Sequence, residues 1–186
     1  MSLTIVDFNN FWSPSGGGVR RYHLEKMNFY RYETDAVYVF VMPDSRTYTE
    51  QLTDSLIIEH VKAFKFPGKW EYRMLWKSSQ IAPILKRHKP DIIEVGSPYI
   101  LPTVVRKNAK KIVPRAKLLG FWHADFPITY VERPIAEKFG KKLGKLASQV
   151  AFAYARYEFK GFTGIQVSAE ETRLRLKRKG LPAHHQ

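Results

Sequence analysis

Short apolar runs alternate with amphipathic stretches along the whole chain, and this alternation is the strongest constraint on its fold. Each apolar run has the length and the β-branched or aromatic content of a buried strand. The stretches between them carry apolar residues every three or four positions, which predicts helices. The alternation favours an α/β fold: a Rossmann-like doubly wound, mostly parallel sheet flanked by helices. The predicted strands are residues 3–8, 36–42, 56–64, 92–96, 116–122 and 164–167.

Five segments with helical spacing accompany these strands, namely residues 18–32, 70–88, 99–111, 134–159 and 168–179. The segment 134–159 has the most regular pattern, and it predicts one long helix. Pro83 is expected to kink the second helix or to break it. Residues 47–53 are expected to form a loop or a short turn. The apolar stripe of the long helix comprises Ile135, Phe139, Leu143, Leu146, Val150, Ala153 and Tyr157.

The composition suits a single folded domain with an anionic partner. The 186 residues are 44% hydrophobic and 14% aromatic, which is enough for a core. The net charge of +14 indicates attraction to nucleic acid, phosphorylated metabolites or an acidic membrane surface, or else only a solvated basic surface. The absence of cysteine excludes disulfides and thiolate metal sites. Because no signal peptide or membrane-spanning run is found, we expect a cytoplasmic protein, peripheral at the inner face of the membrane if it binds lipid.

Three consecutive glycines lie between the first predicted strand and the first predicted helix. Gly16, Gly17 and Gly18 lack a Cβ atom, so the chain can adopt positive φ there and a ligand can approach the main chain closely. The following helix would add free N–H groups and the positive end of its dipole, which favour a phosphate. The triplet matches neither GxGxxG nor the P-loop pattern, so a plain tight turn is the alternative.

A histidine and an aspartate directly follow the predicted strand 116–122. His123 can hydrogen-bond a sugar hydroxyl or a phosphate, or transfer a proton. Asp125 can hold a hydroxyl or orient the histidine. The alternative is that both side chains only satisfy amides of the loop.

Glu94 and Ser97 end the neighbouring predicted strand, with the same two alternatives. Ligands of doubly wound sheets bind outside the carboxyl ends of the strands, at the point where the strand order reverses. Three stretches are therefore expected to share one rim of the sheet, namely residues 9–18, 96–99 and 123–130.

Four lysines lie mostly off the apolar stripe of the longest predicted helix. They would meet anionic lipid headgroups if this were a membrane-surface helix. A solvated face of a helix packed on the sheet is the simpler alternative. No metal site is expected, because the terminal pair His184 and His185 has no further ligands. The four lysines are Lys138, Lys141, Lys142 and Lys145.

Four segments carry a resemblance to a known family: FWSPSGGGVRRY (11–22), KPDIIEVGSP (89–98), WHADFPITY (122–130) and VSAEET (167–172), the last followed by a helix ending in RKGL. In order they resemble the Gly-rich loop, the Pro-Asp-hydrophobic strand, the His-x-Asp-Phe-Pro loop and the closing strand and helix of one domain. That domain is the N-terminal domain of retaining GT-B glycosyltransferases of the glycogen-synthase-like family four type. The resemblance covers nearly the whole chain.

The resemblance implies one half of a GT-B fold, in which two Rossmann-like domains face each other across a cleft. The N-terminal domain binds the acceptor and the C-terminal domain binds a nucleotide-diphosphate sugar. The sugar is transferred to a sugar or lipid-linked acceptor with retention, and no metal cofactor is expected. By position, Gly16, Gly17 and Gly18 would contact the donor diphosphate and His123 would lie by the reacting sugar. The acceptor side would comprise Arg20, Glu94, Ser97 and Asp125.

The resemblance also implies that a second domain is missing. Residues 1–180 would form the N-terminal domain, residues 181–186 would begin the interdomain linker, and the donor-binding domain would be absent. We therefore expect an acceptor-side half that lacks turnover until that domain or a partner chain completes it.

Two other functions are compatible with the sequence. The first is a basic nucleic-acid-binding module of Rossmann-like fold, which the net charge of +14 favours. Against it, the basic residues form no stripe interleaved with aromatic residues. The second is a standalone phosphate-binding or dehydrogenase-like domain, which the missing GxGxxG pattern disfavours.

Overall fold

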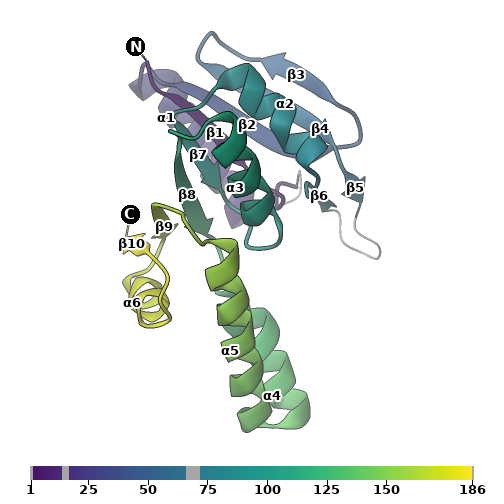
Figure 1. Cartoon of the computed structure of the whole chain (residues 1–186), viewed down its shortest axis with the longest axis vertical. Helices are drawn as coiled ribbons and strands as arrows, with labels where there is room; N and C mark the ends of the chain where they lie inside the picture. The colour runs from purple at the N-terminus through teal and green to yellow at the C-terminus, as the bar shows by residue number, and fades with distance from the viewer. Residues whose placement is uncertain (1, 14–16, 66–71, 186) are drawn as a thin grey trace.

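The computed structural model of the chain describes residues 2–13, 17–65 and 72–185. Strands and helices alternate through most of its length (Figure 1). In chain order the elements are β1 (Thr4–Phe8), α1 (Gly18–Glu33), β2 (Val37–Asp44), β3 (Tyr48–Gln51), β4 (Leu56–Lys62), β5 (Phe64–Lys65), β6 (Arg73–Met74), α2 (Ser78–His88), β7 (Ile92–Val95), α3 (Leu101–Ile112), β8 (Lys117–Trp122), the π-helical segment η1 (Pro127–Glu132), α4 (Arg133–Phe139), α5 (Lys141–Glu158), β9 (Gly164–Val167), α6 (Glu170–Arg178) and β10 (Ala183–His185).

The predicted Rossmann-like α/β fold is confirmed. In the described part of the chain, eight strands form one sheet in the order β10-β9-β8-β7-β1-β2-β4-β3. Every neighbouring pair is parallel except β3 and β4, which are antiparallel at one edge. A short antiparallel pair, β5 and β6, stands apart from this sheet.

Different helices cover the two faces of the sheet, because successive residues of a strand point to opposite sides. Ile5 and Tyr38 are buried with Met27 of α1 in a smaller cluster on one face. Their neighbours Val6 and Val39 belong to the main core, together with apolar residues of α2, α3 and α5. The sheet is therefore wound on both sides, as the alternation of strands and helices predicts.

The strand order reverses between β1 and β7. From β1 the chain moves outward through β2 and β4, and it then returns to the other side of β1 and continues through β7, β8, β9 and β10. Phe8 is paired with Val95, and Val95 with Gly120, so the strands β1, β7 and β8 end near the same level. The predicted rim at the carboxyl ends of these strands is confirmed.

The predicted single helix over residues 134–159 is wrong. The segment forms a helical hairpin of α4 and α5, and Gly140 between them has a φ of +93°. Glycine adopts this backbone conformation without the strain that a Cβ atom would cause. Gly144 lies so close to Ala136 that an added Cβ would stand 2.7 Å from the Cβ of that residue. The two helices therefore pack against each other, and the hairpin extends away from the sheet (Figure 1).

The apolar stripe of that segment is not packed on the sheet. Phe139, Leu143, Leu146 and Val150 are 51–66% exposed. Only residues near the end of α5, such as Phe152, reach the core. The helical spacing of these apolar residues was correctly predicted. The burial of their side chains against the sheet was not, because the chain reverses at residue 140 and carries the stripe away from the sheet.

Three further segments differ from the prediction. Residues 48–51 of the expected loop form the edge strand β3, and α2 begins only at Ser78 with Pro83 inside it. Part of that predicted helix, residues 70–71, lies outside the described residues. Residues 183–185, expected in a linker, form β10 beside β9, and Leu181 and Ala183 are buried. The sheet therefore continues through the segment expected to leave it.

Candidate functional site

Three polar or small residues meet where the strand order reverses. Asn9 follows β1, Gly96 follows β7 and His123 follows β8. The Asn9 side-chain nitrogen Nδ2 lies 2.6 Å from Nε2 of His23, on α1, and 3.3 Å from Nε2 of His123. Its oxygen Oδ1 accepts a 2.7 Å hydrogen bond from the backbone N–H of Phe11, which fixes the orientation of the amide.

This orientation of Asn9 determines the tautomers of both histidines. An amide nitrogen only donates, so each Nε2 atom facing it must be an unprotonated acceptor. Each ring then carries its hydrogen on Nδ1. In His23 that atom lies 3.4 Å from a carboxylate oxygen of Asp7. In His123, no hydrogen bond of Nδ1 to another described residue is found.

His123 is held neutral by its surroundings. Burial, reinforced by the neighbouring His23, lowers the pKa of His123 to about 3. The ring packs beside Phe121 and Tyr22, with centroid separations of 4.1 and 5.4 Å. At neutral pH this side chain is therefore an uncharged imidazole, whose N–H group suits a hydroxyl more than an anion.

Gly96 permits the close approach of Asn9 and His123. A Cβ atom at residue 96 would stand 2.5 Å from Nδ2 of Asn9 and 2.9 Å from Nε2 of His123. Any side chain there would displace one or both of these groups. The absence of a side chain at this position is thus part of the site.

A buried charged network lies beneath the rim. The Lys26 ammonium, from α1, is 2.8 Å from Asp7 Oδ2 and 2.6 Å from Glu94 Oε2. The hydroxyl of Tyr38 donates to Asp7 at 2.6 Å, and that of Tyr22 donates to Glu94 at 3.2 Å. The network fixes α1 to β1 and β7, the two strands at the reversal.

The pKa values in this network depend on burial and on Lys26. Burial opposes ionisation of Asp7, but Lys26 and His23 outweigh it and hold the pKa of Asp7 well below its ordinary value. Burial also raises the pKa of Glu94, and its attraction to Lys26 only partly offsets this. Burial disfavours the charged form of Lys26 as well, but the two carboxylates outweigh it and raise the pKa of Lys26 above its ordinary value.

The glycine loop is described only in part. Gly16 lies outside the described residues, Gly17 precedes α1 and Gly18 is its first residue. Gly17 has a φ of −77°, and neither it nor Gly18 has positive φ, so the expected use of positive φ is wrong for these two. Both are exposed, and a Cβ atom on either would meet nothing within 4 Å. The first turn of α1 has no acidic residue and no side-chain cap among the described residues, and its first N–H groups have no partner within the helix itself.

The remaining predicted residues occupy different environments. Arg20 is exposed on the first turn of α1. Ser97 is buried, and its hydroxyl has no hydrogen-bond partner among the described residues. Asp125 is ion-paired with Arg175 of α6. Burial raises the pKa of Asp125, and Arg175 opposes that rise. Glu94 belongs to the buried network beneath the rim and is not itself at the rim surface.

Several residues of the site were not singled out from the sequence. Asn9 and Gly96 lie in the stretches predicted at the rim, but no individual role was predicted for either of them. Asp7 within an otherwise apolar strand was one signal, because a buried carboxylate needs a partner. Lys26 and Tyr22 lie four residues apart on α1 and therefore share one helix face.

Two negative findings concern the described residues alone. No three His, Asp or Glu side chains among them are grouped so as to hold a metal ion. No helix among them combines the length and the apolar character needed to cross a membrane.

Comparison with known proteins finds no matching family model and no matching curated protein.

Proposed function

We propose that the chain is the acceptor-binding half of a retaining glycosyltransferase of GT-B architecture. The observation that carries the proposal is the meeting of Asn9, Gly96 and His123 at the reversal point, where Asn9 also contacts His23 of α1. An uncharged Nδ1–H group suits a sugar hydroxyl, and the uncapped N-terminus of a helix suits a phosphate. The two features together match the two parts of a nucleotide-diphosphate sugar.

In this proposal the residues have separate roles. His123 donates a hydrogen bond to a hydroxyl of the transferred sugar, and the backbone amides of Gly17 and Gly18 face the diphosphate. Arg20, on the same first turn, adds a positive charge toward the acceptor or the phosphate. Ser97 offers a hydroxyl near the acceptor, and Asp125, through its pair with Arg175, fixes the loop after β8. The donor would be held mainly by a second domain, which makes this chain inactive by itself.

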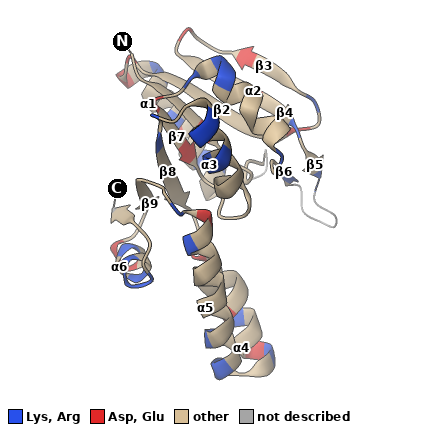
Figure 2. Ribbon diagram, viewed as in Figure 1, with Lys and Arg blue, Asp and Glu red and all other residues tan. Residues whose placement is uncertain are grey.

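The alternative is a basic nucleic-acid-binding module, motivated by the net charge of +14. Figure 2 shows the Lys and Arg residues on separate helices, among them α3, α6 and the α4–α5 hairpin. A nucleic-acid interface would concentrate them along one face with aromatic side chains between them. Tight binding of RNA or DNA that falls steeply with salt concentration would favour this alternative over the glycosyltransferase.

The proposal is tested by titrating the 15N-labelled chain with UDP-glucose and with GDP-mannose. We expect weak binding that shifts the amide signals of Gly18, Gly96 and His123. His123→Ala should reduce the shifts, because it removes the N–H donor. The control His184→Ala changes an exposed histidine of β10, at the far edge of the sheet, and should leave the shifts unchanged.

A further inference from the structure

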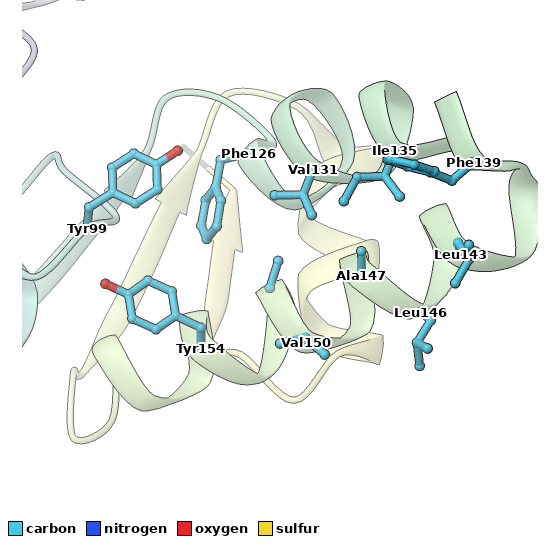
Figure 3. Close-up of a pocket in the computed structure, with 11 residues that line it drawn as sticks. Tyr99, Phe126, Val131, Ile135, Phe139, Leu143, Leu146, Ala147, Val150 and Tyr154 are labelled. Atoms are coloured by element: carbon cyan, nitrogen blue, oxygen red, sulfur yellow. The ribbon is translucent and has the colours of Figure 1, made fainter. Parts of the chain in front are cut away.

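The α4–α5 hairpin carries an apolar face that the described residues leave uncovered. Phe139, Leu143, Leu146 and Val150 line a groove of about 720 Å³ between the two helices (Figure 3). These four side chains are 51–66% exposed. Monomeric proteins rarely expose a continuous apolar surface of this kind unless it has a partner.

The tip of the hairpin is strongly basic. Lys138, Lys141, Lys142 and Lys145 are all exposed, and no ion pair joins any of them to a described residue. Glu137 is the one acidic residue between positions 136 and 146. The Lys138 ammonium lies 5.3 Å from the centre of the Phe139 ring, so positive charge and apolar surface are adjacent.

We propose that the α4–α5 hairpin docks onto an anionic lipid bilayer. The apolar side chains of its tip enter the boundary between headgroups and acyl chains, and the lysines contact the lipid phosphates. A basic charge beside an apolar face is the combination that binds an anionic membrane surface, whereas the apolar face alone would not select the charge of its partner.

A second copy of the chain fits this surface less well. A symmetric dimer buries the same patch on both subunits, and with the two tips side by side it would bring the lysines of one tip near those of the other. Repulsion between these like charges opposes such a dimer. An anionic bilayer supplies the opposite charge, so it satisfies both the lysines and the apolar face.

Docking has a consequence for the candidate site. The inner end of the groove is lined by Tyr99, two residues after Ser97, and by Phe126, directly after Asp125. A docked hairpin therefore links the rim to the lipid surface through an apolar path. The docking itself does not depend on the proposed transferase function, so the two proposals can fail separately.

Co-sedimentation with vesicles tests the docking. We expect the chain to bind vesicles of phosphatidylcholine with phosphatidylglycerol, and to bind pure phosphatidylcholine much less. Raising the salt from about 0.1 M to about 1 M should release it, because the screening length falls from about 10 Å to about 3 Å. The double variants Phe139→Ser with Leu143→Ser and Lys141→Glu with Lys142→Glu should each lower the partition coefficient at least about tenfold.

Matched controls change similar residues elsewhere. Phe29→Ser removes an exposed phenylalanine of α1, and Lys110→Glu with Lys111→Glu reverses two exposed lysines of α3. Both should change the partition less than about twofold, because surface changes away from the docking face leave it intact. Circular dichroism confirms that each variant is folded.

Three results would overturn the docking proposal. One is equal loss of vesicle binding in the hairpin variants and their controls. Another is equal binding of the chain to vesicles with and without the anionic lipid. The third is a wild-type chain that binds no vesicles and forms a dimer in light scattering, together with a Phe139→Ser and Leu143→Ser double variant that is monomeric. That result would assign the apolar face to a second copy of the chain.

Discussion

At the scale of single residues, the site depends on contacts that fix an uncharged histidine. Asn9 donates to both His23 and His123, and the backbone of Phe11 fixes the direction of the Asn9 amide. Gly96 supplies the space in which this arrangement fits. The chemistry of His123 is therefore set by neighbours from β1, α1 and β7.

Gly96→Ala should disrupt this arrangement. The added methyl group would overlap Asn9 and His123, so we expect a loss of about 1–3 kcal/mol in the free energy of unfolding. The imidazole of His123 should also move, which NMR detects as changed 15N ring signals. Gly18→Ala is the matched control, because a Cβ atom there meets nothing. Its unfolding free energy should stay within about 0.5 kcal/mol of wild type or rise slightly. Equal effects of the two substitutions would contradict the role given to Gly96.

The buried network predicts a defined response to pH. The pKa of Asp7 is lowered, so its contribution to stability is present above about pH 3.9 and is lost as the pH falls. The pKa of Lys26 is raised, so its contribution is complete below about pH 10.4 and is lost as the pH rises through the folded-state value. Because burial raises the pKa of Glu94, Lys26 bridges two ionised carboxylates only above that raised pKa and below about pH 10.4.

Lys26→Met should lower the free energy of unfolding by about 3–5 kcal/mol at pH 7, because Asp7 and Glu94 remain buried without a cation. Without Lys26, both carboxyls should have raised pKa values. The deficit should therefore shrink as the pH falls toward 5 and they take up protons. Urea denaturation at both pH values measures this. Lys107→Met, at an exposed position on α3, should have little effect at either pH. If the loss of unfolding free energy caused by Lys26→Met grew as the pH fell, Lys26 would not be the cation that balances Asp7 and Glu94.

At the scale of elements, the sequence predicted what local patterns encode. The core strands β1, β2, β4, β7, β8 and β9 are short apolar runs, and their burial on both faces makes them recognisable. Strand β3 was missed because all four of its residues are exposed and carry no apolar pattern. The reversal at Gly140 was missed because the helical spacing continues through it. The contacts of Asn9 and Lys26 could not be predicted, since they arise only when α1 packs beside β1 and β7.

The helical hairpin depends on a close contact between its two helices. An added Cβ at Gly144 would lie 2.7 Å from both the Cβ of Ala136 and the carbonyl oxygen of Glu132. Gly144→Ala should therefore separate α4 from α5 and destabilise the hairpin by about 1–3 kcal/mol. Hydrogen exchange should accelerate in α4 while the strands stay protected. Gln149→Ala, exposed on the same helix, should leave the exchange unchanged. If hydrogen exchange accelerated equally in the whole chain, the hairpin would not open independently of the sheet.

At the scale of the whole molecule, the sheet, the site and the hairpin form one arrangement. The reversal between β1 and β7 brings the candidate site to one rim of the sheet, and the loop after β8 leads from His123 into the hairpin. The net charge of +14 favours anionic partners for the molecule as a whole. In our account the rim contacts a nucleotide-diphosphate sugar and its acceptor, while the hairpin contacts the lipid surface.

The most direct test of the central proposal is the affinity and location of nucleotide-sugar binding, measured by NMR titration of the 15N-labelled chain with UDP-glucose and GDP-mannose. We expect a dissociation constant on the order of 1 mM for at least one of them, because in the proposed enzyme most donor contacts would belong to a second domain. The shifted amides should lie at Gly18, Gly96 and His123. Submicromolar affinity, no shift with either sugar, or shifts confined to other elements would contradict the proposed acceptor-side half of a glycosyltransferase.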